Sequence, residues 1–391
     1  MAERIQKITG PRGISYLVRV EFPPDPVTGK RRQRSKAFKT KREAEKHLAV
    51  WLVEIERGTA IDGAKMTVGQ YLLHWLETSV KHTVRRSTYL SYEHLIRNHL
   101  IPALGAVSLQ KLQPVQVQAF YSEKLNAGRS DGKGGGLSPR TVRYLHTVLR
   151  KALQQAMKWG MVARNVCDAT DPPRAVRPHV KIWTPEEARQ FLQAAAEDTY
   201  AVAWLVALTT GLRRGELLAI RWQDVDLTKG LLHVRQSLNA VGGERYFEQP
   251  KTAAGRRVVA LSSETVAALR IHRVRQNAQR LRCGSAWRDH DLIFTVPDGG
   301  PVWPDDLTHR FNVLVKAAGA PRIRLHDLRH THATMLLKEG VHLKIVSERL
   351  GHGGIQITAD VDSHVTPDMQ RQAADSVDSA LFGGDVKASV K

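Results

Sequence analysis

Two short segments in the second half of the chain carry charged side chains at spacings that suit a chemical site. TTGLRRGELL places Arg213 directly after a glycine turn, with Glu216 about one helical turn later. PKTAAGRR places Lys251 in or beside a β-turn, from which a long side chain can reach away from a sheet. The candidate residues in these two segments are thus two cations, Arg213 and Lys251, and one carboxylate, Glu216.

Two further segments add imidazole groups and another arginine. LHDLRHTHATMLLKEG places His326 and Arg329 three residues apart, and therefore on one face of a helix. LGH is typical of a helix that ends at Gly351, which leaves His352 at its C-terminal edge. All four segments therefore contain candidate site residues.

Each segment taken alone also has a simpler interpretation. A buried Arg–Glu pair can belong to the packing, and a lone lysine on a hairpin usually has no special role. His326 and His330 are four residues apart, as in a metal-binding HExxH helix, but Asp327 stands in place of the glutamate and no third ligand is evident. A metal site is therefore disfavoured, and we expect no cofactor.

The composition indicates a polyanionic partner. The chain has 59 Lys and Arg against 38 Asp and Glu, a net charge of +21, with a pI of about 10.2. An excess of this size favours nucleic acid first and an acidic membrane second. No apolar run approaches the ~20 residues that span a bilayer, and the two cysteines form no CxxC motif.

The N-terminal segment predicts a small DNA-binding module. ISYLVRVEF, the turn PPDPVTGK and KRRQRSKAF form a hairpin pattern with a very basic second strand, and Thr40 and Glu43 then open a helix as a capping box. A β-ribbon can enter a groove of B-DNA, although a solvated charged strand is the alternative. The candidate DNA-contacting residues here are Arg31, Arg32, Arg34, Lys36 and Lys39.

Residues from Met66 to about Arg174 predict an all-helical domain, because apolar residues recur at three- and four-residue intervals. Basic residues occur at intervals along these helices, and we expect some of them to contact DNA phosphates. The alternative is that these scattered charges are simply solvated. The candidates are Arg85, Arg86, Arg140 and Arg143.

The proline-rich stretch CDATDPPRAVRPHV predicts a linker, after which Thr184, Pro185 and Glu187 open a new helix. Helices then alternate with a short β region made of GLLHVRQSL and RYFEQPKTAAGRRVVAL. The fold class is therefore multidomain and mainly α, with a small sheet-plus-helix N-terminal module, an all-α domain and a mixed α+β domain. The expected boundaries are 1–62, 66–174, 181–385 and a tail at 386–391.

In this order, TGLRRGEL, the lysine of PKT, HDLRHTHAT and LGH resemble the tyrosine recombinase (phage integrase) family. The resemblance covers most of the chain, since the first two segments look like the arm-binding and core-binding domains of an arm-binding integrase. HDLRHT followed by LGH at this distance is the most specific part of it. The resemblance implies a site-specific recombinase that integrates or excises a phage or mobile element.

The resemblance also implies roles for the four segments. Arg213 and Arg329 would clamp the oxygens of the scissile phosphate, because a guanidinium fork matches phosphate and stays charged. Lys251 would protonate the departing 5′ oxygen. His326 would hydrogen-bond the phosphate or accept a proton, and His352 would donate to another phosphate oxygen. The remaining residue, Glu216, would orient Arg213 or His326.

Family members attack the phosphorus with a tyrosine and form a 3′-phosphotyrosyl bond. That tyrosine is expected shortly after LGH, just before SHV, and Asp362 occupies the position. No tyrosine occurs after Tyr246. A carboxylate is shorter than a phenol and would give a hydrolysable acyl phosphate, so we expect this chain to be catalytically inactive.

The resemblance implies double-stranded DNA with arm-type and core-type sites as the partner, a homotetramer on DNA, an excisionase or other directionality factor, and no membrane. It implies a location in the cytoplasm of a bacterial host, with the nucleoid. Two other functions stay open: a non-catalytic, architectural DNA-binding relative, and a metal-dependent nuclease that would use Asp360, Asp362 and His352.

Overall fold

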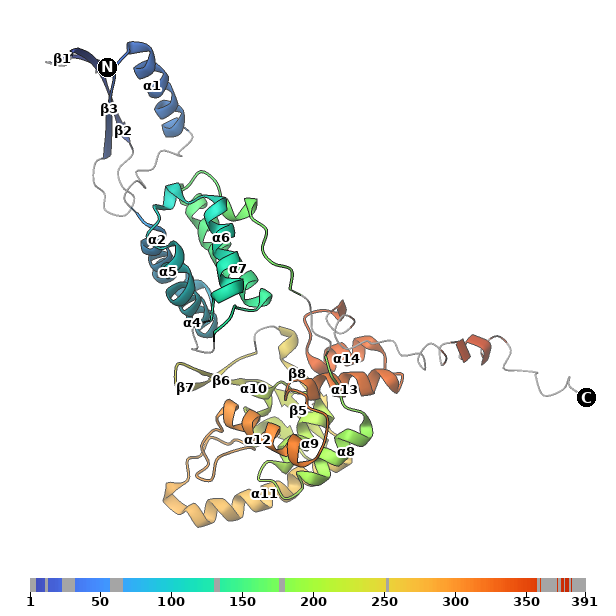
Figure 1. Ribbon diagram of the computed structural model, residues 1–391. Helices are drawn as coiled ribbons and strands as arrows, with labels where there is room; N and C mark the ends of the chain where they lie inside the picture. The colour runs from blue at the N-terminus through green and yellow to red at the C-terminus, as the bar shows by residue number, and fades with distance from the viewer. Residues whose placement is uncertain are drawn as a thin grey trace, which may run out of the picture. The chain divides into compact units, whose positions relative to one another are not determined.

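A computed structural model describes most of the chain, and its contacts divide it into two compact units, Met1–Arg177 and Pro178–Lys391. Figure 1 shows the elements of each unit. The described residues are 5–10, 13–22, 32–56, 66–129, 134–175, 180–250, 253–356, 359, 371, 374–375, 377–379 and 381.

The first unit begins with a three-stranded antiparallel sheet and one helix. Its elements are β1 (Ile5–Gly10), β2 (Gly13–Phe22), β3 (Arg32–Phe38) and α1 (Lys41–Glu56), with strand order β1-β2-β3. Val18, Val20, Ala44 and Trp51 form the buried cluster between sheet and helix. The predicted hairpin and helix are therefore confirmed, and β1 is a strand that the hydrophobic pattern did not reveal.

The rest of the first unit is helical, as predicted. Its main helices are α2 (Val68–Trp75), α4 (Arg86–Leu95), α5 (Ile101–Leu104), α6 (Pro114–Ala127) and α7 (Pro139–Lys158). Five-residue π-helical stretches continue α2 and α4 at Leu76–Val80 and Ile96–Leu100. The buried Tyr71 hydroxyl donates to the Ala152 carbonyl at 2.6 Å, which joins the first of these helices to the last.

The second unit combines helices with two small antiparallel sheets. Its helices are α8 (Pro185–Ala194), α9 (Ala201–Thr210), α10 (Arg214–Leu217), α11 (Ser263–Cys283), α12 (Pro304–Ala317), α13 (Asp327–Lys338) and α14 (Leu343–Leu350). Its strands are β4 (Val225–Asp226), β5 (Leu231–Val234), β6 (Ser237–Val241), β7 (Glu244–Glu248) and β8 (Arg257–Ala260). The sheets have the orders β4-β5-β8 and β6-β7.

The second unit has its own core, built around α8, α9 and α12. Trp204 and Phe311 are fully buried and their rings lie 5.8 Å apart, while Phe191 contacts both. The Thr184 capping box predicted at the start of α8 is present, with both reciprocal hydrogen bonds. This core includes residues of α9, α10 and the start of α13, while a separate buried cluster of Ala333, Leu337, Val346 and Leu350 packs α14 against α13. The candidate site lies at the ends of these helices.

Candidate active site

Helix ends position the predicted site residues of the second unit. Arg213 is the N-cap of α10, His326 is the N-cap of α13, and Arg329 lies in the first turn of α13. Gly351 ends α14 with a left-handed φ of 67°, and Gly211 ends α9 with a φ of 64°. The structure thus brings Arg213, Arg329 and the end of α14 together from distant parts of the sequence.

Arg213 and Glu216 form the ion pair that their spacing predicts. The Arg213 Nη1 donates to Glu216 Oε1 at 2.7 Å, and the Arg213 backbone N–H donates to Oε2 at 3.0 Å. The side chain of Glu216 is 4% exposed and that of Arg213 is 39% exposed. The carboxylate is therefore buried, while the guanidinium reaches the surface.

A second arginine, Arg257 at the start of β8, binds the same carboxylate. Its Nη2 lies 2.9 Å from Glu216 Oε2 and its Nη1 lies 3.2 Å from Oε1. Burial raises the pKa of Glu216, but the hydrogen bonds and charges of Arg257 and Arg213 outweigh this, so its pKa is lowered and the group is ionised. Two cations share one buried anion, which leaves the cluster positive.

Three arginines also converge on the last carbonyl groups of α14. Helix C-termini leave backbone carbonyls without partners inside the helix, and they carry the negative end of the helix dipole. Each of three consecutive carbonyls accepts a hydrogen bond from a different guanidinium. The pairs are Arg257 Nε with Arg349 O at 2.6 Å, Arg329 Nη2 with Leu350 O at 2.7 Å, and Arg213 Nη2 with Gly351 O at 3.1 Å.

Arg329 is held from a second direction as well. Its Nη1 donates to the carbonyl of Gly211 at 2.9 Å, and the residue is only 3% exposed. Position 211 also has no room for a side chain, because a Cβ there would lie 2.7 Å from both His332 and Leu350. The glycine turn of TTGLRRGELL is therefore required both for its backbone conformation and for the close approach of α13 and α14.

His326 is a neutral imidazole beside these cations. Desolvation by the surrounding side chains, with the nearby charges of His330 and Arg329, lowers its pKa to about 4, while part of the residue stays exposed. Its ring meets the ring of His330 edge-on, with centroids 5.2 Å apart. At neutral pH it is therefore able to accept a proton.

Asp327, which stands where a metal-binding HExxH helix has its glutamate, is engaged by Arg324. Asp327 accepts from the backbone N–H of Arg324 at 2.7 Å and from its guanidinium at 2.7 Å. Within the described residues, no group of three or more His, Cys, Asp or Glu side chains could hold a metal ion.

Several predicted residues lie elsewhere or outside the description. Lys251, Asp362, Asp360 and Arg31 lie outside the described residues, as do the side chains of Arg32 and Arg34. His352 is half-buried, and its backbone N–H donates to Ser347 O at 3.0 Å. The other candidate DNA contacts lie in the first unit: Lys36, Lys39, Arg86, Arg140 and Arg143 are exposed and Arg85 is half-buried.

The motifs did not reveal Arg257, Arg349 or His332. Arg349 Nε donates to His332 Nε2 at 3.2 Å, and His332 Nδ1 lies 2.8 Å from Leu208 O. Strand alternation could have found Arg257, since it shares a strand face with the buried Val259. No comparable sequence signal marks the other two.

Comparison with known families and proteins covers all three segments. Residues 181–367 match the Phage integrase family, residues 67–125 the Phage integrase N-terminal SAM-like domain, and residues 5–55 an Arm DNA-binding domain. An integrase of Streptomyces ambofaciens is 31% identical over 347 residues, 85% of each chain. The tyrosine recombinase XerC-like protein of Caldanaerobacter subterraneus is 29% identical over 88% of this chain and 91% of its own.

Solved structures share the fold. The Tn1549 transposon integrase, solved with transposon right end DNA, has a TM-score of 0.66 at 23% identity and covers 80% of this chain and 99% of its own. A lambda integrase dimer bound to a COC′ core site has a TM-score of 0.56 at 17% identity and covers 93% and 95%. In the described part of this chain, no helix is long and apolar enough to span a membrane.

Two histidines with lowered pKa values predict a pH-dependent stability. Burial lowers the pKa of His332 to about 4, and desolvation by neighbouring side chains lowers that of the more exposed His326 to about 4 as well. The unfolded chain takes up these protons near ~6.5, so the free energy of unfolding falls as the pH falls from ~6.5 towards ~4. Histidine-selective NMR should show both rings neutral down to about that pH, and urea unfolding should show the loss. His332→Gln should flatten the decline, whereas the exposed His290→Gln should not.

Gly211→Ala should destabilise the second unit more than Gly340→Ala does. Both glycines have positive φ, 64° and 77°, but a Cβ at Gly340 meets nothing within 4 Å. The shared left-handed conformation costs roughly 1–2 kcal/mol, and crowding against His332 and Leu350 should add about 1–3 kcal/mol. Amide hydrogen exchange in α13 measures the difference. Equal losses in the two variants would contradict the close approach of α13 and α14.

Proposed function

The chain belongs to the phage integrase family of tyrosine recombinases, and we propose that Arg213, Arg329, His326, His352 and Lys251 form its scissile-phosphate site. Members of this family are site-specific recombinases that act on double-stranded DNA. The observation that carries the proposal is the convergence of Arg213 and Arg329 on adjacent carbonyls at the end of α14, beside a neutral His326.

The two arginines would stabilise charge on the non-bridging phosphate oxygens. Attack on phosphorus concentrates negative charge on those oxygens, so cations fixed before the reaction lower its barrier. Arg213 is held by a buried carboxylate and Arg329 by two carbonyls, so neither has to be ordered when DNA binds. No step of this scheme requires a metal ion.

The other side chains would move protons and bind the remaining oxygen. His326, neutral because its pKa is lowered to about 4, would hydrogen-bond the phosphate or accept the proton of the nucleophile. His352 follows the end of α14 and would donate to a second phosphate oxygen. Lys251 falls between β7 and β8 in the sequence and would protonate the 5′ oxygen as it leaves.

Asp362 would leave this site without its nucleophile. An attacking carboxylate would have to reach farther than a phenol oxygen, and a misplacement of about 1 Å already costs roughly 100-fold in rate. With a reference pKa of ~3.9, Asp362 would also be ionised and would compete with phosphate for the two arginines. We therefore infer that the chain binds its sites but does not recombine them.

The domain organisation would serve two kinds of DNA site. Residues 1–62 would bind arm-type sites, 66–174 and 181–385 would enclose the core site, and 386–391 would form a tail. We infer a homotetramer on paired sites and a directionality factor that selects excision. The DNA-contacting residues of the first unit would be Arg31, Arg32, Arg34, Lys36, Lys39, Arg85, Arg86, Arg140 and Arg143.

A non-catalytic DNA-binding relative is the second candidate function, and Asp362 is the observation that favours it. The intact set of arginines and histidines argues for a catalytic site that lacks one group.

Asp362→Tyr should restore covalent chemistry. On a nicked suicide substrate that carries the core site, the unaltered chain should form no covalent DNA complex, and Asp362→Tyr should form one that survives denaturing electrophoresis. Asp362→Phe is the matched control, because it supplies the ring without the hydroxyl and should trap nothing. Covalent trapping by the unaltered chain would overturn the assignment of position 362. A folded but inert Asp362→Tyr would favour the non-catalytic relative.

A further inference from the structure

We propose that Arg257 is a positioning residue for the phosphate clamp: it binds Glu216 so that Arg213 stays available to DNA. This inference rests on the proposed scissile-phosphate site and assigns a further residue to it. The Arg257 side chain is 6% exposed against 39% for Arg213, and its Nε, Nη1 and Nη2 all donate to protein acceptors, Arg349 O and the two carboxylate oxygens of Glu216.

The balance of charge around Glu216 is the first observation that supports this proposal. A lone Arg213–Glu216 pair would be neutral, and the carboxylate would draw both branches of the Arg213 guanidinium to itself. Arg257 changes this, because its guanidinium contacts both carboxylate oxygens, at 2.9 and 3.2 Å, while the Arg213 guanidinium contacts only Oε1, through Nη1. The Nη2 branch of Arg213 is directed instead to the Gly351 carbonyl, at the end of α14.

The second step is the connection that Arg257 makes to the helix end. Its Nε donates to Arg349 O at 2.6 Å, two residues before the carbonyl that Arg213 binds. Arg257 is also the first residue of β8 and is paired with Val234 of β5. One side chain thus connects strand β8, the Glu216 carboxylate and the end of α14.

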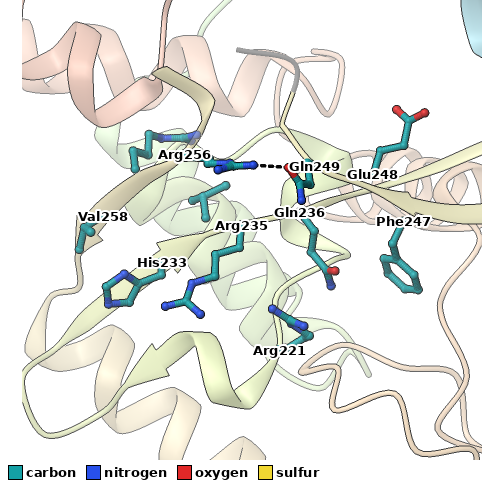
Figure 2. A pocket seen from close by; sticks show the side chains of 11 residues that line it. Arg221, His233, Arg235, Gln236, Phe247, Glu248, Gln249, Arg256 and Val258 are labelled. Atoms are coloured by element: carbon teal, nitrogen blue, oxygen red, sulfur yellow. Dashed lines mark hydrogen bonds between the residues drawn. The ribbon is translucent and has the colours of Figure 1, made fainter. Parts of the chain in front are cut away.

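The neighbouring residue provides a matched control. Arg256 has the same charge and lies one position earlier, but it is exposed and donates to Gln249 rather than to Glu216. Figure 2 shows it among the side chains that line a surface pocket, together with Arg221, His233 and Arg235. Arg256→Gln and Arg257→Gln each remove one positive charge. A difference in DNA binding between these two variants therefore results from the position of the arginine and not from the net charge.

Phosphate-neutralisation interference tests the proposal without any need for catalysis. A core-type duplex is selected from a random pool with the unaltered chain, and each phosphate is replaced in turn by an uncharged methylphosphonate. For the unaltered chain, neutralisation of the clamped phosphate should weaken binding on the order of tenfold, the loss of one charge-assisted contact. Arg213→Gln should abolish that penalty. If no such phosphate exists, or if Arg213→Gln keeps the penalty, the proposed phosphate site fails before Arg257 is tested.

Arg257→Gln should lower the penalty at that phosphate to less than about threefold, because Glu216 then neutralises Arg213. Arg257→Lys should give an intermediate value, since it keeps the charge and loses the planar fork. Arg256→Gln should keep the full penalty. Circular dichroism and thermal unfolding of each variant establish that it is folded.

The double variant Glu216→Gln/Arg257→Gln separates positioning from simple structural support. Without the Glu216 carboxylate, Arg213 is no longer neutralised by that residue, so the double variant should recover most of the penalty that Arg257→Gln loses. This comparison also decides the matter if Arg257→Gln alone fails to fold. A full penalty in Arg257→Gln, an equal loss in Arg256→Gln, or no recovery in the double variant would each overturn the proposal.

Discussion

Three guanidinium groups share the last carbonyl groups of one short helix, and the geometry of the site depends on this shared anchor. Arginines repel one another, so a cluster of them needs compensating negative charge. The end of α14 supplies part of it through its dipole and unpaired carbonyls, and Glu216 supplies the rest. The cluster thus keeps a net positive charge for an anion while each arginine remains fixed in place.

The packing around this anchor explains where glycines and aromatic residues occur. Gly211 and Gly351 end their helices in the left-handed conformation, and both are too tightly surrounded for a side chain. The aromatic core of Trp204, Phe191 and Phe311 holds α9 in place. Since α9 ends at Gly211, whose carbonyl binds Arg329, the core packing and the site geometry are connected through a single turn.

The sequence predicts the fold class, the family and the members of the main motifs, because each is a local pattern. Thr184 caps its helix as its spacing indicates, and Arg213 meets Glu216 one turn later. A local pattern does not reveal contacts between side chains that are far apart in the sequence. Arg257 binds a carboxylate 41 positions away and Arg349 binds the carbonyl of Thr209, so neither role is visible in its own segment. The strand β1 was missed for a related reason, since pairing with β2 stabilises a short segment of mixed polarity.

The shared anchor also has a thermodynamic consequence. Because the guanidinium groups of Arg213 and Arg329 donate to the end of α14, the affinity of these arginines for any anion is linked to the position of that helix. Linkage is reciprocal: an anion that favours one placement of α14 is bound more tightly, by the same factor, whenever something else favours that placement. The chain continues from this helix beyond Gly351. A force on the C-terminal segment that shifts α14 should therefore also change the affinity of Arg213 and Arg329 for an anion.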